Sequence, residues 1–592
     1  MTDKVAITLK EGTTRAKLGW ARRAMHVSAG LILTVLTHTA AQAQQSLRVD
    51  PTGRSGEQRP RLLEEQPPNS PPQWILPPPP PPPAGKAEHL PLAHVLVREI
   101  RLTGNTAISA QELATITAPY VNRDLTSEDL EALRLALTHY YINKGYINSG
   151  AIIPDQTVTD GVVTLHIIEG ELSQIEVTGN TRLRASYIQN RLALDAGPPV
   201  NMNAMQRRLQ LLQQDPLIER LNAELSPGVG PGDSILHVRV DERPPYSVWM
   251  GFNNYQSPTV GAERGLLSLE HRNLTGYGDS LSVTYGGSAG VNPQLDSLYT
   301  SPITARDTTL SLEYRKNDFT AVEAPFDPLD IDSHSDIYGL TLRHPFYRTP
   351  NQELAFSLIG EHLESKQFLL GTPFSFSPGV QNGKATITAA RLALEWTDRS
   401  PTQVIAARSR FSLGLDVWDA TTNRSSLPDG RFFSWLGQFQ WARRWGTYGI
   451  QTLARMDLQL ANDPLLPLEQ IAVGGRFTVR GYRENTLVRD NAFVGSLEAS
   501  IPVIGNQWWA DTVQLVPFVD FGTAWNTTVP TPSPQTLASV GIGLRWQVTI
   551  PRPILLTPQF EIYWGLPLRH VPTPGGNLQD MGVHLQFAIA AF

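Results

Sequence analysis

Alternation of apolar and polar residues dominates the sequence from Tyr246 to Phe592. A period of two residues predicts β-strands that each present one apolar face. Clusters of glycine, asparagine, aspartate and proline separate the runs, as expected for turns. The clearest runs have apolar residues at Leu281, Val283 and Tyr285, at Leu354, Phe356 and Leu358, at Phe411, Leu413, Leu415 and Val417, at Val540, Ile542, Leu544 and Trp546, and at Phe560, Ile562 and Trp564.

This segment is long enough for a membrane-spanning barrel. Tilted transmembrane strands take about 9 to 11 residues each, so with turns and loops the segment accommodates about 16 strands. A soluble β-sandwich shows the same alternation, but one of this length would be unusual. Aromatic residues near the strand ends favour the barrel, because such residues collect at membrane interfaces. They are Trp435, Trp441, Trp508, Trp509 and Trp564.

A different pattern, of mixed helices and strands, occupies residues 97–240. The first group has predicted strands at Val97–Leu102, Tyr146–Ile153 and Val162–Ile168, and predicted helices at Ser109–Ile116 and Ser127–Lys144. The second group repeats this order, with strands at Ser173–Thr178, Ile218–Leu225 and Ser234–Val240 and helices at Arg184–Leu194 and Asn201–Gln214. The first strand of each group ends in Thr-Gly-Asn, which indicates an internal repeat of a βααββ module. Ser127 with Asp129 is predicted to cap the second helix.

The first 93 residues predict no packed core. Residues 1–43 are interpreted as a signal peptide, in which basic residues precede an apolar run, Val27 to Leu36, and a small-residue cleavage site, Ala41-Gln42-Ala43. Met25 is an alternative start. Residues 44–93 are interpreted as a linker, since the seven consecutive prolines from Pro77 to Pro83 favour an extended chain. Within the linker, residues 56–66 fit either a short amphipathic helix or disordered chain.

Composition narrows the range of partners. The formal net charge of −6 provides no concentrated positive charge for phosphates, so we expect no nucleic-acid partner. The chain has no cysteine, which excludes disulfides, thiolate metal sites and thiol nucleophiles. Its histidines show no metal-ligand spacing, so we expect no metal and no cofactor.

Two glycine-rich segments match motifs of enzymes. Gly286-Gly287-Ser288-Ala289-Gly290 fits the Gly-x-Ser-x-Gly pattern, which places its serine on a sharp turn between a strand and a helix. Two prolines follow, so a hairpin loop is predicted instead. Gly228-Val229-Gly230-Pro231-Gly232 precedes a strand and is interpreted as a turn, since a phosphate site needs a helix there. We therefore expect no catalytic residues and no enzyme.

The most specific pattern lies between Val473 and Pro502. It contains Gly474-Gly475 and then the tetrapeptide Val479-Arg480-Gly481-Tyr482, and a strand-like run, Phe493–Ile501, follows. Downstream stands Phe518-Val519-Asp520-Phe521-Gly522. Within the strand predicted there, Asp520 lies on the face opposite to Val519 and Phe521, so it is predicted to face the interior of the barrel.

In this order the motifs resemble the inward-folding loop and the acidic barrel-strand motif of the Omp85 and two-partner secretion transporter superfamily. The βααββ modules resemble POTRA domains, and two copies point to the two-partner secretion branch of haemolysin and filamentous-haemagglutinin exporters. The resemblance implies that Arg480 pairs with Asp520, and a bidentate contact would pin the loop, residues 462–491, inside the barrel. Phe518 and Gly522 belong to the strand motif. The alternative is a solvent-facing loop with Arg480 paired to Glu484 or Asp490.

The implied fold is α+β, with periplasmic POTRA modules at 94–170 and 171–244 and a C-terminal 16-stranded antiparallel transmembrane β-barrel at 245–592. The implied cellular location is the outer membrane of a Gram-negative bacterium. The implied function is to capture a secreted partner exoprotein with the POTRA modules and to pass it through the barrel without ATP. Outer-membrane lipid and the barrel-assembly machinery are the other implied partners. An assembly insertase of the same superfamily and a passive porin are the alternatives, and the exported partner stays open.

The C-terminal strand departs from the pattern of such barrels, which normally end in an aromatic residue in register with the apolar face. Phe592 lies on the face opposite to Val583, Leu585, Phe587 and Ile589. Either a bulge intervenes or the assembly signal is degenerate.

Overall fold

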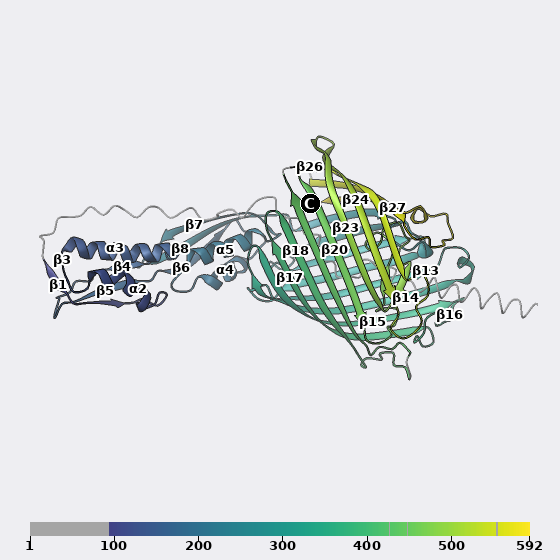
Figure 1. The fold of residues 1–592 in the computed structure, drawn as a ribbon, viewed down its shortest axis with the longest axis horizontal. Helices are drawn as coiled ribbons and strands as arrows, with labels where there is room; N and C mark the ends of the chain where they lie inside the picture. The colour runs from purple at the N-terminus through teal and green to yellow at the C-terminus, as the bar shows by residue number, and fades with distance from the viewer. Residues whose placement is uncertain (1–93, 425–426, 447, 552–554) are drawn as a thin grey trace, which may run out of the picture.

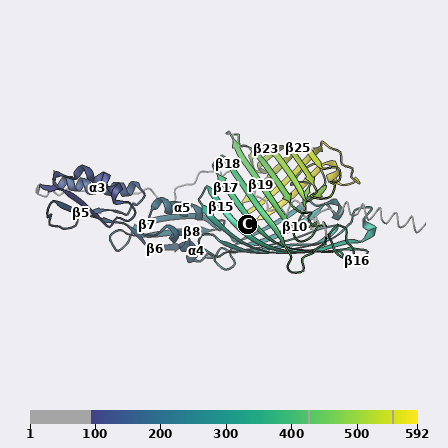
Figure 2. The same cartoon turned by 60° about the horizontal axis from the view of Figure 1, so that its bottom comes forward.

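The computed structural model describes residues 94–592 apart from 425–426, 447 and 552–554. Two small α+β modules lie one after the other beside a large β-barrel (Figure 1). The same succession is visible after rotation (Figure 2). The signal peptide, the linker and the possible helix at 56–66 lie outside the described residues.

The first module packs two helices on a small sheet. Its elements are β1 (Val95–Val97), β2 (Glu99–Thr103), α2 (Ala110–Thr117), η1 (Ala118–Tyr120), β3 (Arg123–Leu125), α3 (Ser127–Asn143), β4 (Gly150–Ile152) and β5 (Val162–Ile168). Strand β5 is central, parallel to β2 and antiparallel to β4, while β1 pairs with β3. Leu113, Leu133 and Leu137 of the helices are fully buried against Val163 and Leu165 of β5.

The second module repeats this arrangement, which confirms the predicted βααββ order. Its elements are β6 (Glu171–Thr178), α4 (Ala185–Leu192), η2 (Ala193–Asp195), α5 (Met202–Gln213), β7 (Ile218–Pro227) and β8 (Asp233–Glu242). Strand β8 runs parallel to β6 and antiparallel to β7. Gly104 and Gly179 of the repeated Thr-Gly-Asn turn have φ angles of +82° and +81°, which glycine adopts without strain.

Two details of the predicted elements are wrong. Thr126, rather than Ser127, caps α3, because its hydroxyl accepts the Asp129 N–H and the Asp129 carboxylate accepts the Thr126 N–H. The strand predicted at Tyr146–Ile153 is reduced to the three residues of β4. The chain before it folds into turns after α3, in which the Tyr146 N–H donates to the Tyr141 carbonyl at 3.0 Å.

Sixteen long antiparallel strands in the described residues close the barrel, as predicted, and β28 pairs with β9. The strands are β9 (Tyr246–Asn253), β10 (Arg264–His271), β11 (Ser280–Ser288), β12 (Val291–Pro302), β13 (Thr309–Thr320), β14 (Ile331–Arg348), β15 (Gln352–Leu369), β17 (Lys384–Arg399), β18 (Gln403–Leu415), β19 (Phe433–Trp445), β20 (Ile450–Ala461), β23 (Asn491–Gln507), β24 (Ala510–Trp525), β25 (Thr536–Gln547), β27 (Leu555–Pro567) and β28 (Val583–Ala591). The two-residue strands β16 (Thr372–Pro373) and β26 (Ile550–Pro551) extend β15 and β27. The loops contain the short helices η3 (Pro258–Val260), η4 (Asp327–Leu329) and η5 (Leu578–Met581).

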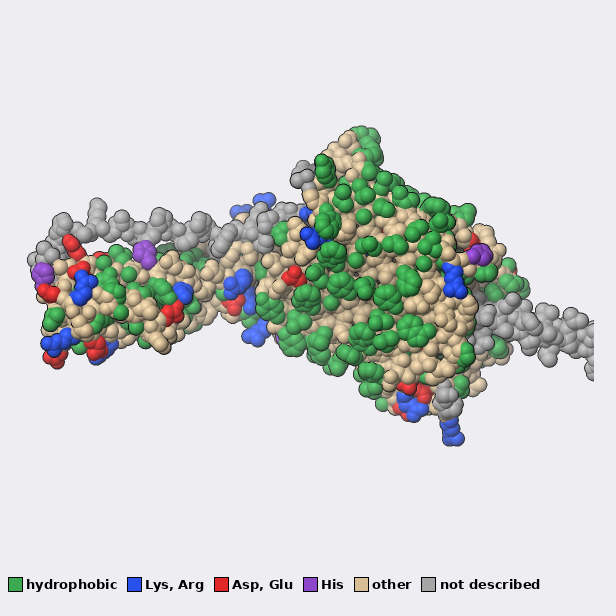
Figure 3. Space-filling model, in the orientation of Figure 1, with side chains coloured by type: hydrophobic (Ala, Val, Ile, Leu, Met, Phe, Trp, Pro, Cys, Tyr) green, Lys and Arg blue, Asp and Glu red, His purple; other side chains and the backbone are tan. Residues whose placement is uncertain are grey.

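The two faces of the barrel wall differ sharply in polarity. On β14, the outward residues Tyr338 and Leu340 are 52% and 49% exposed, whereas the inward Ser333 and Ser335 are buried. Hydrophobic side chains cover most of the outer wall in Figure 3. An apolar exterior around a polar interior is the pattern of a barrel in lipid. Among the described residues, no helix has the length and apolar character needed to cross a membrane.

The second module contacts the turns at one end of the barrel. Arg191 of α4 pairs with Asp307 of the β12–β13 turn at 2.8 Å. The Gln214 amide donates to the Pro350 carbonyl at 3.0 Å, and the Arg184 Nε donates to the Thr275 carbonyl at 3.2 Å. Successive strands of the barrel run in opposite directions. The β23–β24 turn and the C-terminus therefore lie at the same end of the barrel as the second module.

The structure also decides three smaller predictions. Ser288 ends β11 and Val291 begins β12, so the Gly-x-Ser-x-Gly segment is the predicted hairpin loop. Residues 228–232 form the predicted turn between β7 and β8. No register shift occurs in the pairing of β28 with β27 or β9, so of the two alternatives for the C-terminal strand the bulge is wrong, and Phe592 lies just beyond the last strand.

Most of the predicted interfacial tryptophans lie near strand ends. Trp508 and Trp509 form the β23–β24 turn, Trp435 is close to the start of β19, and Trp564 is close to the end of β27. Trp441 lies inside β19 instead.

Candidate functional site

The candidate site is a loop that folds back into the barrel. It connects β20 to β23, spans residues 462–490, and is called the inward loop below. It contains a two-stranded hairpin of β21 (Ile471–Val473) and β22 (Leu487–Arg489). Nearly every residue from 465 to 490 is buried. A solvent-facing loop would have mostly exposed side chains, so the alternative of a solvent-facing loop is wrong.

Arg480 lies at the centre of a buried ionic cluster. Its Nε donates to Asp520 Oδ2 at 2.8 Å and its Nη2 donates to Asp520 Oδ1 at 2.9 Å, which is the bidentate geometry. Its Nη1 donates to Glu498 Oε2 at 2.7 Å. The side chains of Arg480, Asp520 and Glu498 are 2%, 0% and 1% exposed. Because these three charged side chains are almost fully removed from water, each would destabilise the fold if its oppositely charged partner were lost.

The alternative partners of Arg480 have other roles. Glu484 Oε1 accepts the Arg476 N–H at 2.6 Å, which closes the turn around Gly475. Asp490 accepts the N–H groups of Leu465 and Thr527, at 3.0 and 2.9 Å, and thereby fixes the base of the inward loop.

The two other residues of the strand motif shape the wall beneath the inward loop. The Phe518 ring packs against the Arg480 guanidinium, 3.7 Å from its carbon, in a cation–π contact. A Cβ at Gly522 would come within 2.5 Å of Val473 and 2.9 Å of Val479. The missing side chain at Gly522 therefore makes room for two apolar residues of the inward loop.

Glycines of the inward loop allow equally close approaches. Gly474, Gly475 and Gly481 all have positive φ, between +90° and +117°. A Cβ at Gly475 would overlap the Glu484 carboxylate at 2.0 Å, and a Cβ at Gly481 would lie 2.8 Å from the backbone of Gly565 in β27. Larger residues at these positions would be strained and would clash.

Tyr482 and Arg483 attach the tip of the inward loop to the rim of the barrel that lies opposite to the modules. The Tyr482 hydroxyl lies 2.9 Å from the Ala538 carbonyl and 3.0 Å from the Arg569 carbonyl. Arg483 pairs with Asp580 and, at 2.7 Å, with Glu323. Burial acts to raise the pKa of Asp580, but the bonds and charge of Arg483 outweigh it and hold that pKa below its usual range.

The structure adds contacts that sequence reasoning missed. Arg391 of β17 binds both oxygens of Glu469 in the inward loop, at 2.5 and 2.9 Å, and its Nε donates to Glu361 of β15 at 2.8 Å. Arg476 pairs with Glu561 of β27 at 3.0 Å. The only sign of these contacts in the sequence is a charged residue on the inward face of a barrel strand. Such a residue does not show which residue of the inward loop it binds.

These contacts attach the inward loop to separate sectors of the wall. Arg480 is bound by β23 and β24, Arg476 by β27, and Glu469 by Arg391 of β17, which also binds Glu361 of β15. Ion pairs, rather than an apolar core alone, therefore fix the loop.

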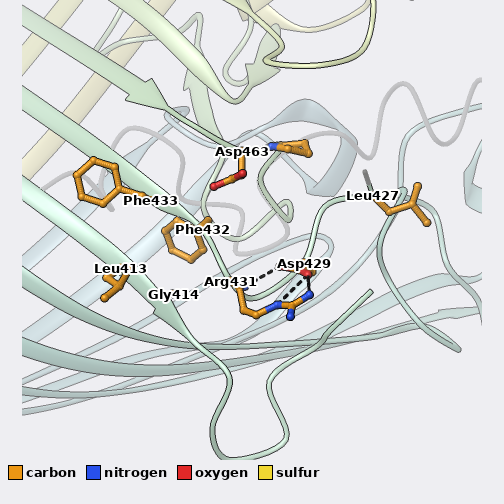
Figure 4. Close-up of a pocket in the computed structure, with 9 residues that line it drawn as sticks. Leu413, Gly414, Leu427, Asp429, Arg431, Phe432, Phe433 and Asp463 are labelled. Carbon is orange, nitrogen blue, oxygen red and sulfur yellow. Dashed lines mark hydrogen bonds and ion pairs between the residues drawn. The ribbon is translucent and has the colours of Figure 1, made fainter. Parts of the chain in front are cut away.

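A separate pocket of about 520 Å³ lies at the rim opposite to the modules, where the β18–β19 loop meets the first residues of the inward loop (Figure 4). Its lining combines the apolar Leu413 and Phe433 with an ion pair, Arg431 to Asp429 at 2.7 Å. Asp429 thus already neutralises Arg431. Among residues 94–592, with the gaps stated above, no cluster of histidine and acidic side chains has the geometry of a metal site.

Comparisons with known proteins agree with this architecture. The family model for the haemolysin secretion/activation protein ShlB/FhaC/HecB matches residues 232–546, and that for the ShlB-type POTRA domain matches residues 95–170. The chain is 23% identical to the outer membrane transporter CdiB of Dickeya dadantii over 445 residues, 73% of this chain and 76% of that protein. It is 24% identical to the hemolysin transporter protein ShlB of Serratia marcescens over 428 residues, 69% and 71% of the two chains.

Solved structures share the fold. CdiB from Escherichia coli matches with a TM-score of 0.65 and 20% identity, over 93% of this chain and 97% of that chain. BamA from Haemophilus ducreyi, lacking POTRA domains 1–3, matches with a TM-score of 0.50 and 16% identity, over 84% and 99%. The predicted two-partner secretion resemblance, the fold class and the outer-membrane location, with the POTRA modules in the periplasm, are confirmed. The chain belongs to the ShlB/FhaC/HecB family of haemolysin secretion/activation proteins.

Proposed function

We propose that this protein secretes a partner exoprotein across the outer membrane, with the POTRA modules as the receptor and the barrel as the conduit. The observation that carries the proposal is a barrel whose interior holds a loop fixed by ion pairs, with the second of two modules in contact with its periplasmic end. Relatives of the chain are described as transporters, among them the heme/hemopexin transporter protein HuxB of Haemophilus influenzae.

The interior is suited to an unfolded polypeptide. Its wall presents polar side chains such as Ser333, Ser335, Gln438 and Gln440, all buried within the barrel. A polar wall offers exchangeable hydrogen bonds and no large apolar surface to retain the chain. The inward loop occupies this interior, so we propose that Arg480 and Asp520 set its position during export.

The modules offer strand edges for capture. Among the described residues, β2 and β4 are the outer strands of the first sheet, and β6 and β7 those of the second. The isoleucines at 152 and 153, at the end of β4, are 41% and 36% exposed. An extended segment of the exoprotein can add a strand at such an edge by main-chain pairing. We propose that folding of the exoprotein outside the cell, rather than ATP, drives export.

Co-expression with the product of a neighbouring reading frame tests this proposal in cells. The exoprotein should accumulate in the medium with the intact chain and stay cell-associated when residues 95–170 are deleted. The deleted protein should still fractionate with the outer membrane as a heat-modifiable band, which separates loss of capture from loss of the barrel.

The competing functions give other outcomes of the same experiment. An insertase would leave the medium unchanged and instead lower the amounts of folded outer-membrane barrels when the chain is depleted. A passive porin would change solute permeability alone, and deletion of residues 95–170 would have no effect on it. Either outcome would overturn the proposed function.

A further inference from the structure

Two strands of the barrel continue past their neighbours on the periplasmic side. The pairing of β20 with β23 ends at Gln451 and Ser500, and the pairing of β25 with β24 ends at Gln547 and Thr512. Residues 501–511 are called the rim hairpin below: along 501–505 the pairing partners are residues 512–515 of β24, which β25 still borders, and residues 506–511 extend past both neighbouring strands. The rim hairpin rises beyond the barrel wall at the top of Figure 1, above the label β26.

The rim hairpin is exposed on both faces. Every residue from Pro502 to Trp509 is exposed, and Val503, Ile504 and Trp508 are 49%, 38% and 92% exposed. Val503 is an extra residue between the pairs Pro502–Gln514 and Ile504–Val513. A bulge of this kind bends and twists a strand pair, which gives the projection its own direction.

Its sequence is more apolar than that of the β12–β13 and β17–β18 turns at the same end of the barrel. No charged residue occurs from Ala499 to Ala510, where the sequence is ASIPVIGNQWWA. The β17–β18 turn, Ser400-Pro401-Thr402, is also uncharged but lacks large apolar residues, and the β12–β13 turn contains the charged Arg306 and Asp307. In Figure 3 the projection shows hydrophobic and uncharged atoms, and these continue into the hydrophobic covering of the barrel wall.

We propose that the rim hairpin is an anchor in the inner leaflet of the outer membrane, with the interfacial region of phospholipid as its partner. Continuity with the lipid-facing wall places it beside the bilayer, and paired tryptophans at the tip favour the headgroup boundary. Apart from Asp511 at its end the rim hairpin carries no charge, and its apolar side chains are otherwise left in water.

The backbone limits the depth of insertion. Within the described residues, the outer edge of β23 from 501 to 507 pairs with no strand of the barrel except β24. Unpaired N–H and C=O groups are not tolerated in the hydrocarbon core, but water and headgroups satisfy them at the interface. The rim hairpin therefore lies along the membrane surface and does not cross it.

The anchor has a mechanical consequence for export. Strands β23 and β24 also supply Glu498 and Asp520, the partners of Arg480. A tip held by lipid steadies the sector of wall that binds the inward loop, while the rest of the interior stays free to adjust.

The absence of cysteine in the chain makes this inference directly testable. Trp508→Cys, and separately Gln507→Cys, are labelled with an environment-sensitive fluorophore in full-length protein. The labelled protein is reconstituted in phosphatidylethanolamine–phosphatidylglycerol vesicles. Thr402→Cys, in the polar β17–β18 turn, is the matched control. Each variant is first shown to form a heat-modifiable barrel.

The expected result is a blue-shifted emission at position 508 or 507, quenching by a nitroxide on the lipid near the glycerol level, and loss of quenching by aqueous iodide. The label at position 402 should respond to iodide and not to the nitroxide. Iodide quenching at 507 and 508 equal to that at 402 would overturn the anchor. Protection from iodide without nitroxide quenching would assign the surface to a protein contact and would overturn it equally.

Discussion

Arg480 binds two carboxylates, those of Asp520 and Glu498. Loss of Arg480 would leave these two carboxylates with different numbers of remaining cationic partners. Glu498 keeps Arg545, at 2.6 Å, whereas Asp520 has Arg480 as the cation on both its oxygens. Removing one member of a fully buried ion pair costs about 3–5 kcal/mol. The cluster is therefore asymmetric around the arginine.

We predict that Arg480→Ala impairs export more than Asp520→Ala does, because the second variant leaves the guanidinium bound to Glu498. The double variant should be little worse than Arg480→Ala alone, since both substitutions remove one shared contact. Secretion and single-channel recordings in planar bilayers measure this, and noisier conductance is expected with barrel assembly retained. Fully additive losses, or wild-type export by Arg480→Ala, would contradict the proposed role of the pair.

A second prediction concerns Glu469. Glu469→Gln keeps the size of the side chain but removes the charge that Arg391 binds, which costs about 1.5–3 kcal/mol for a hydrogen bond to a charged group. The base of the inward loop should loosen, and planar-bilayer recordings should show more frequent open events. Glu353→Gln, which alters ion pairs with Arg343 and Arg348 on the wall, is the control. Identical traces from the two variants would show that Glu469 does not hold the loop.

At this scale the sequence predicts part of the site. Asp520 can be placed inside the barrel because strand parity separates it from Val519 and Phe521, and its pairing with Arg480 follows from the resemblance. Glu498 obeys the same parity, yet nothing in its spacing shows that it shares Arg480. Arg391 and Glu469 are far apart in the chain, and only the closed barrel brings them together.

At the scale of elements, the repeated corner of the two modules carries a pH-sensitive contact. Glu169 accepts the N–H groups of Thr106 and Ala107, both at 2.8 Å, and in the second module Glu242 accepts the N–H groups of Thr181 and Arg182 at the equivalent positions. Burial acts to raise the pKa of Glu169, but these bonds outweigh it and hold that pKa below its usual range.

Because this pKa is lowered by folding, the stabilisation is present above the ordinary value of 4.5 and is lost as the pH falls through the folded value. We predict that the Ala107 amide loses protection from hydrogen exchange below that range, relative to its intrinsic rate. Glu169→Gln should lower the protection at neutral pH and flatten its pH dependence. Glu171→Gln, at an exposed position nearby, should behave as wild type. An unchanged pH profile in Glu169→Gln would refute the assignment.

The predicted elements are largely confirmed where periodicity is long, as in the barrel strands and α3. Errors occur where local turns compete with a periodic pattern, as before β4, and at a helix start where Thr126 and Ser127 are both capable of capping. The rim hairpin could not be predicted, because the lengths of β23 and β24 relative to their neighbours depend on pairing across the whole barrel.

At the scale of the whole molecule, two POTRA modules, a membrane barrel and an ion-paired loop are combined in one chain. No nucleotide-binding motif was found in the sequence. We propose that recognition and transport both reside in this chain and that folding of the exoprotein outside the cell supplies the free energy.

Transport by purified components tests that claim most directly. Full-length protein in liposomes, with the modules facing outward in part of the population, is mixed with unfolded exoprotein encoded by the neighbouring reading frame and with no nucleotide. The account predicts exoprotein that enters the vesicles and resists added protease, and a protein lacking residues 95–170 should give none. Exoprotein that stays fully sensitive to protease, or that becomes protected only when ATP is supplied, would contradict it.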